Sequence, residues 1–202
     1  SQNLGNLKKN LISDFNLTCI GDNRAHSCML TKYGGSQSDK ALLEVYKQKK
    51  IKFKTYPFLL RGSDERQFNS PGIDLPITSI FRSSYNGYKE YHTSLDDFKL
   101  VTLKGIKGGF EVAKKAIDNL QKRIIPISTH LCEPMLSKRK LHEGKITGFY
   151  NRKDINNTLN LLHFLQYSDG NNNLKDISKY IKLKYSSTLQ IYKILKKNKL
   201  IY

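Results

Sequence analysis

Short apolar runs and one amphipathic stretch follow each other in the first part of the chain. Apolar runs bounded by turn residues cover residues 14–20, 26–30, 51–60 and 73–81, and their β-branched and aromatic content predicts strands. Residues 38–46 place apolar side chains at helical spacing after a Ser-Asp pair, which predicts a capped helix with one buried face. Strands that alternate with a helix and with polar loops are typical of a layered α/β domain.

A second helical pattern completes this layer. Residues 100–103 predict a strand or extended edge, and Gly108 and Gly109 then open a helix. Its predicted buried face consists of Phe110, Val112, Ala113, Ala116, Ile117 and Leu120. We expect the α/β domain to occupy residues 1–130.

The end of the chain predicts a separate helical unit. Residues 131–152 lack periodicity and predict a connector, so the last domain is expected at residues 153–202. Apolar spacing predicts helices at residues 155–167, at 174–181 and from Ser186 onward. Three helices at this spacing resemble a winged helix-turn-helix, which can place its third helix in a DNA groove. Such modules also make protein contacts.

Two polar clusters, residues 63–66 and 91–97, lie before and after the strand predicted at 73–81. Loops on a rigid scaffold usually carry binding and catalytic groups. His92 is the side chain of this region that can act as a zinc ligand or as a base near neutral pH, and the alternative is a structural histidine. Asp22 follows the first strand, where ligands bind in open α/β sheets, and its alternative is an Asx turn.

The segments SDERQFNSPGIDLPI and YHTSLDD resemble the C-terminal part of zinc-dependent aminopeptidases, a superfamily that also contains glutaminyl cyclases. The matching positions are Ser63, Asp64, Phe68, Gly72, Ile73, His92, Thr93 and Asp96, with Glu65 where the superfamily has a histidine. Together with residues 132–139, the chain resembles a bacterial branch of aminopeptidase-like proteins that carry a C-terminal winged helix.

The resemblance implies a mixed-sheet fold and a zinc-dependent hydrolase of peptides or other amides, and together with the chemistry of the polar loops it gives six candidate site residues. These are His92 and Asp22 as metal ligands, Asp64 and Glu65 as catalytic carboxylates, and Arg66 and Tyr91 as substrate-binding side chains. A carboxylate of this set would orient a ligand, and a forked arginine would pair with a substrate carboxylate. The alternative for these carboxylates and for Arg66 is a set of surface ion pairs between loops.

The resemblance also implies that further metal ligands and the general base precede the segment matching residues 17–22. We therefore expect this chain to be the second half of such an enzyme, inactive alone. Its expected partner is the missing N-terminal half or another subunit.

Charge supplies an alternative function. The net charge is +18, of which +5 lies in residues 1–103 and +13 in residues 104–202. A basic half suggests nucleic acid bound through the winged helix, or a protein partner, whereas lysines on solvated helix faces need no ligand. The sequence contains no bilayer-spanning apolar run, no signal pattern and three cysteines without metal spacing. These features predict a cytoplasmic protein without a membrane partner.

Overall fold

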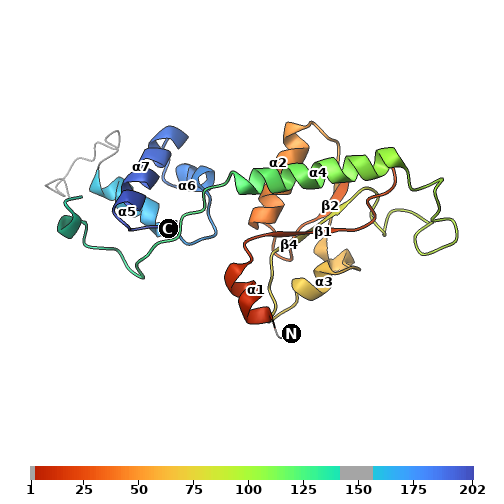
Figure 1. The fold of residues 1–202 in the computed structure, drawn as a ribbon, viewed down its shortest axis with the longest axis horizontal. Coiled ribbons are helices and arrows are strands. Elements are labelled where there is room, and N and C mark those ends of the chain that lie inside the picture. Colours follow the sequence, from red (N-terminus) through yellow and green to blue (C-terminus); the bar gives the residue numbers. More distant parts are fainter. Residues whose placement is uncertain (1–2, 142–156) are drawn as a thin grey trace. The chain divides into compact units, whose positions relative to one another are not determined.

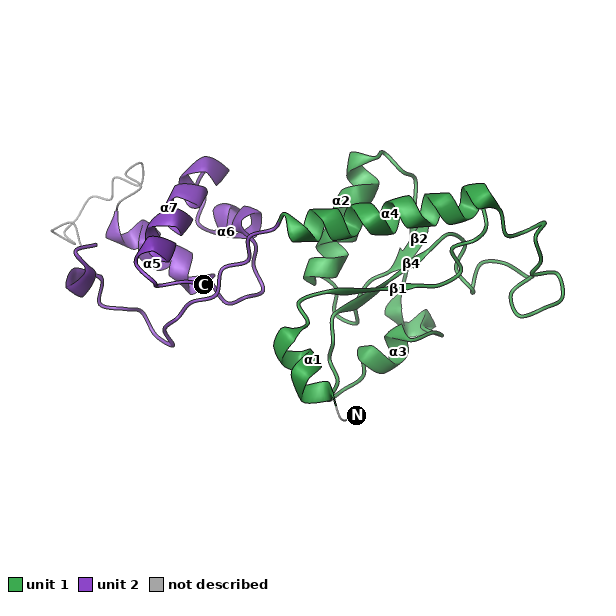
Figure 2. Cartoon of the chain, viewed as in Figure 1, with its two compact units in different colours: residues 1–122 green, residues 123–202 purple. Residues whose placement is uncertain are grey.

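A computed structural model of the chain describes residues 3–141 and 157–202. The chain divides into two compact units, residues 1–122 and 123–202 (Figure 2). This division lies before residue 130, the predicted end of the first domain, and residues 142–152 of the predicted connector lie outside the described residues.

Unit 1 is built on a four-stranded sheet with the strand order β1-β4-β2-β3. The strands are β1 (Asp14–Leu17), β2 (Ser27–Met29), β3 (Lys54–Tyr56) and β4 (Ile77–Phe81). β1 runs parallel to β4, β3 runs parallel to β2, and β2 runs antiparallel to β4, which confirms the predicted mixed sheet. β3 and β4 are shorter than their apolar runs because Pro57 and Pro76, which cannot donate to a ladder, border them.

Helices cover both faces of this sheet, with α2 and α4 on one side and α1 and α3 on the other (Figure 1). They are α1 (Leu4–Asn10), α2 (Gln37–Gln48), α3 (Glu65–Phe68) and α4 (Leu103–Gln121), besides a 3-10 helix at Phe58–Leu60. Neighbouring residues of β4 point to opposite faces. The Thr78 hydroxyl donates to Asp39 of α2 at 2.6 Å, and the Ser79 hydroxyl donates to Glu65 of α3 at 3.0 Å. The core between the sheet, α2 and α4 contains Cys28, Leu42, Val45, Tyr46, Ile80, Val112, Ala113 and Ala116.

The sequence-based interpretation of α4 is wrong in two respects: where the helix begins and which side chains it buries. No strand forms at residues 100–103, because the Thr102 side chain caps α4 by accepting a hydrogen bond from the Gly105 amide at 3.0 Å. The glycines do not open the helix. Gly108 and Gly109 instead allow close contact, since a Cβ on Gly109 would lie 3.0 Å from the Ile20 Cβ and a Cβ on Gly108 would lie 3.0 Å from the Arg82 guanidinium. The second error concerns Phe110 and Ile117, predicted as buried, which are 59% and 46% exposed.

Unit 2 contains the three predicted helices. They are α5 (Thr158–Gln166), α6 (Leu174–Tyr180) and α7 (Tyr185–Lys197), preceded by a 3-10 helix at Leu136–Arg139. Residues 155–156 of the first predicted helix lie outside the described residues. Eleven buried apolar side chains, among them Phe164, Ile177 and Leu195, form a core of their own. In the described ranges of both units, no helix is long and apolar enough to cross a bilayer.

Candidate functional site

Glu65 is the most constrained of the predicted site residues. Its side chain, carried by α3, is 1% exposed and faces Asn16 and Ser79, two residues that pair in the β1–β4 ladder. One oxygen accepts hydrogen bonds from these two side chains, at 3.0 Å from each donor. The other accepts from the Gly62 and Ser63 amides and from the Tyr85 hydroxyl at 2.9–3.0 Å.

These donors decide the protonation state of Glu65. Burial alone would raise the pKa of the carboxyl group, but the hydrogen bonds from Ser63, Gly62 and Tyr85 outweigh burial, so the pKa is lowered. The carboxylate is therefore ionised at neutral pH and its oxygens are already engaged. It is suited to holding Tyr85 in place, and it is a poor general base because it holds a proton weakly.

Two tyrosines connect Glu65 to His92, and a third packs beside them. The Tyr85 ring packs edge-on against Phe81, and its centroid lies 5.8 Å from that of Tyr91, which is also 5.8 Å from Tyr88. Burial raises the pKa of Tyr85 and its bond to Glu65 raises it further, so this phenol keeps its proton. Gly62 is required for this packing, since a Cβ there would lie 2.9 Å from the Tyr85 ring.

His92 lies at the outer end of the tyrosine cluster (Tyr85, Tyr88 and Tyr91). Its ring stacks on Tyr91 with centroids 3.9 Å apart and an angle of 18° between the planes. The residue has a φ of 57° and an exposed side chain. The structure therefore joins three predicted site residues, Glu65, Tyr91 and His92, in one network, and it leaves the imidazole open to solvent.

Asp22 lies in the loop after β1 and is held by hydrogen bonds to two neighbouring residues. Its buried carboxylate accepts hydrogen bonds from the Ser83 amide at 2.7 Å, the Ser83 hydroxyl at 2.9 Å and the Arg24 amide at 2.8 Å. The bond to Arg24, two residues on, is the Asx turn considered as the alternative. Burial would raise the pKa of Asp22, but the bonds from Ser83 and Arg24 prevail and lower it. Asp22 thus ties the end of β1 to the end of β4.

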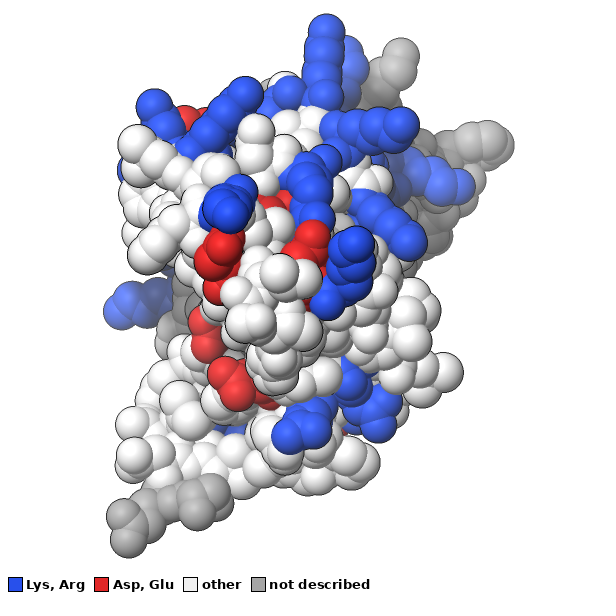
Figure 3. Space-filling model, turned by 90° about the vertical axis from the view of Figure 1, so that its right-hand side faces the viewer, with Lys and Arg blue, Asp and Glu red and all other residues white. Residues whose placement is uncertain are grey.

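Arg24 links these two loops a second time. Its guanidinium lies 3.2 Å from the Glu90 carboxylate and 5.3 Å from the centre of the Tyr88 ring. Figure 3 shows acidic and basic side chains interspersed on the face of unit 1 that carries these loops. The loops after β1 and β4 are therefore cross-linked around the tyrosine cluster.

Asp64 and Arg66 are not part of this network. Both side chains are exposed on either side of Glu65, and neither has a hydrogen-bond or ion-pair partner within the part of the chain that the structure describes. Arg66 is accessible to a substrate carboxylate. Asp64 precedes α3 but does not cap it through its side chain.

A complete metal site is not present among residues 3–141 and 157–202. No group of three or more His, Cys, Asp and Glu side chains in these ranges is placed to hold a metal ion. Neither His92 nor Asp22 therefore belongs to a three-ligand group there, and the residues described do not fit a zinc ion on their own.

Sequence analysis missed most of the partners in this network. Asn16 and Ser79 give no signal, because polar residues inside apolar runs say nothing about which carboxylate they meet, and Ser83 resembles an ordinary turn residue after its run. Tyr85, Tyr88 and Tyr91 did leave a signal, since they recur every third residue in YNGYKEY between the strand and His92.

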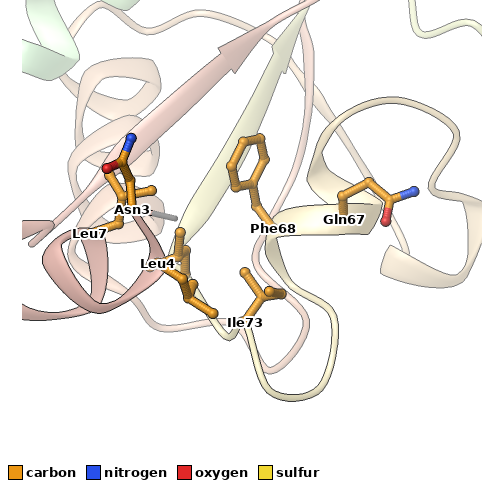
Figure 4. A pocket seen from close by; sticks show the side chains of 7 residues that line it. Asn3, Leu4, Leu7, Gln67, Phe68 and Ile73 are labelled. Carbon is orange, nitrogen blue, oxygen red and sulfur yellow. The ribbon is translucent and has the colours of Figure 1, made fainter. Parts of the chain in front are cut away.

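A separate apolar pocket of about 320 Å³ lies between α1 and α3. Leu4 and Leu7 of α1 face Phe68 and Ile73 across it (Figure 4). Its lining contains no ionisable side chain, so it offers no group for acid–base chemistry.

Comparisons with known proteins agree with this division of the chain. Residues 1–123 match a family described as "Domain of unknown function (DUF4910)", and residues 124–202 match the winged helix-turn-helix family, which confirms the predicted winged helix. A Clostridium acetobutylicum protein named "Putative polysaccharide biosynthesis protein with aminopeptidase-like domain" is 32% identical over 176 residues, covering 87% of this chain and 39% of that protein. The crystal structure of a "putative peptidase" from Clostridium acetobutylicum has a TM-score of 0.59 and 26% identity, covering 98% of this chain and 43% of that one. The chain spans about two fifths of the length of these relatives.

Proposed function

The chain belongs to the DUF4910 family through residues 1–123, and we propose that it forms part of a zinc-dependent aminopeptidase-like hydrolase. The names of the two longer relatives support the class of reaction. The observation that carries the proposal is the network that runs from Glu65 through Tyr85 and Tyr91 to the exposed His92.

The residues of this network take distinct roles in the proposal. His92 supplies one metal ligand, because its imidazole is exposed and fixed by stacking on Tyr91. Tyr91 and Arg66 contact the peptide or amide substrate, and Glu65 positions Tyr85. The described residues do not complete a zinc site, so we assign no step of the reaction to a metal.

The remaining ligands would come from a further section of polypeptide, and unit 1 has a surface suited to it. In the described part of the chain β1 pairs only with β4, which leaves its other edge open. α4 exposes an apolar stripe along Leu103, Ile106, Phe110 and Ile117. The stripe points away from α2, because Glu111, on the opposite flank of the helix, pairs with Lys49 of α2 at 3.2 Å.

An open strand edge beside an apolar stripe usually marks an interaction surface. We therefore place on it the counterpart of the sequence that the two relatives have beyond the matched stretch. A second copy of this chain fits less well, because Lys107 and Lys114 flank the stripe. An antiparallel pair of α4 helices centred on Phe110 would bring these lysines together.

Metal binding by single variants tests the proposed role of His92. Equilibrium dialysis against zinc should show one weak site that His92→Ala removes. His163→Ala, which removes an exposed histidine of unit 2, should leave that site unchanged. Zinc retained in full by His92→Ala would refute the metal-ligand role.

Unit 2 supports a second candidate function, nucleic-acid binding. Four exposed positions of α7, namely Ser186, Gln190, Lys193 and Lys197, lie on one stripe at helical spacing. Residues 123–202 carry 15 Lys and Arg against 5 Asp and Glu. A basic stripe on the third helix of a winged helix has the charge needed for phosphate contacts.

A salt titration distinguishes nucleic-acid binding from lysines that are merely solvated. For a fluorescent DNA duplex, the logarithm of the association constant should fall linearly with the logarithm of the salt concentration. Replacing both Lys193 and Lys197 by Ala should reduce that slope by about 2. The same double change at Lys114 of α4 and at Lys122, which follows the helix, serves as the control. Equal slopes for the two double variants would exclude α7 as the DNA-binding surface.

A further inference from the structure

A charged cavity of about 430 Å³ lies beside the tyrosine cluster. Its walls come from the loop after β1, from the turns that follow His92 and from the start of α4. Four charged side chains line it, Arg24 and Lys99 with Glu90 and Asp97, and two leucines, Leu95 and Leu100, add apolar surface. The volume falls within the range of about 300–1,000 Å³ that is usual for small-molecule sites.

The four charges are not all used by the protein itself. Arg24 and Glu90 pair with each other, with the nearest nitrogen–oxygen distance at 3.2 Å. Asp97 uses one oxygen to accept a hydrogen bond from the Lys99 amide at 2.7 Å, and no bond to its second oxygen is formed in the described ranges. The Lys99 ammonium also has no ion-pair partner among the described residues. One anionic and one cationic group therefore remain available to a ligand.

This balance restricts the ligand. An anion such as phosphate would be attracted by Lys99 but would also face Glu90 and Asp97, and a polyamine would meet Lys99 and Arg24. A ligand that carries one positive group, one negative group and an apolar side chain complements the free charges and the two leucines of the cavity. Free α-amino acids have this composition.

We propose that this cavity binds an apolar α-amino acid as its zwitterion, with the carboxylate on Lys99 and the ammonium on Asp97. The choice of ligand rests on the proposed function, because removal of an N-terminal residue from a peptide releases such an amino acid. The cavity shares a wall with the site, since Arg24 lies over Tyr88 and Glu90 precedes Tyr91. The amino acid would thus be held next to the tyrosine cluster.

Calorimetric titrations of the purified chain with four probes test the inference without metal or turnover. L-leucine should bind. N-acetyl-L-leucine, which lacks the ammonium, and L-leucinamide, which lacks the carboxylate, should each bind at least about ten-fold more weakly. Glycine should bind more weakly than leucine because it leaves the leucine walls uncovered.

Two variants assign the binding to this cavity. Lys99→Met and Asp97→Asn should each weaken leucine binding by about ten-fold or more, and Asp97→Asn keeps an oxygen for the Lys99 amide. Lys122→Met and Asp118→Asn, both near the far end of α4, are the matched controls and should bind leucine like the natural chain. The inference is overturned if leucine does not bind, if the blocked leucines bind equally well, or if the cavity variants match their controls. If leucine binds with the expected preferences, the cavity proposal is supported even when His92 binds no zinc. A lack of zinc binding at His92 would count only against the proposed hydrolase function.

Discussion

At the scale of single residues, Glu65 shows how a buried charge is stabilised. Five donors from two strands, a loop and Tyr85 surround its carboxylate. Replacing it with Gln would turn an amide group toward some of these donors. We expect Glu65→Gln to lower the free energy of unfolding by on the order of 3 kcal/mol in urea denaturation. The control Asp64→Asn, at an exposed position, should change it by no more than about 0.5 kcal/mol. Equal losses in the free energy of unfolding for the two variants would show that the hydrogen-bond donors around residue 65 do not require a negative charge there.

His26 predicts a dependence of stability on pH. Its ring accepts a hydrogen bond from Arg82, and burial, followed by the Arg82 charge, lowers its pKa from 6.5 to about 4. Between these values the unfolded chain binds a proton that the folded chain does not. The stabilisation is therefore complete above pH 6.5 and is lost as the pH falls toward 4.

Thermal unfolding recorded from pH 7.5 to 4.5 measures this effect. The midpoint temperature of unfolding should decrease as the pH is lowered in the natural chain. It should decrease less in His26→Gln, whose side-chain oxygen can still accept a hydrogen bond from Arg82. The control His163→Gln should follow the natural chain. A slope that His26→Gln leaves unchanged would assign the effect to other groups.

Sequence analysis could single out His92, Tyr91 and Glu65 because each lies in a dense polar cluster next to a predicted strand. It could not foresee that Glu65 would be saturated with donors, because these donors come from residues 14 or more positions away as well as from its own loop. It named the Asx turn at Asp22 as an alternative because that turn is local.

At the scale of elements, the exposed apolar stripe of α4 leads to a testable prediction. Phe110 lies on the exposed stripe, whereas Val112 is 1% exposed in the core of unit 1. In the isolated chain, Phe110→Ala should change the free energy of unfolding by less than about 0.5 kcal/mol. Val112→Ala, the matched control in the same helix, should lower it by about 2 kcal/mol. A large loss for Phe110→Ala in urea denaturation would mean that this chain already covers the stripe.

The limits of prediction at this scale have physical causes. Apolar runs bounded by turn residues located the four strands, and helical spacing located α2 and the three helices of unit 2, because apolar side chains cluster where a segment packs against a core. α4 was predicted to begin too late, since glycines that permit close packing resemble a helix boundary in sequence. The burial of Phe110 was predicted wrongly because an apolar position on a helix faces either a core or an interaction surface.

At the scale of the whole molecule, the two units have separate cores. Every side chain of the unit 2 cluster lies within residues 124–201. We therefore expect residues 124–202, expressed alone, to be helical by circular dichroism and to unfold in one cooperative transition. A fragment without a cooperative transition would show that unit 2 needs residues 1–123 to fold.

The central claim is that His92 belongs to the same site as Glu65 and the tyrosine cluster, and paramagnetic Co²⁺ tests it most directly. In nuclear magnetic resonance spectra of the chain, Co²⁺ bound at His92 should broaden the signals of Tyr91, Tyr85 and Glu65. The His92→Ala variant should lose this broadening. If Co²⁺ broadens His92 while the signals of Tyr85 and Glu65 stay sharp, the histidine and the carboxylate do not share a site, and the account is contradicted.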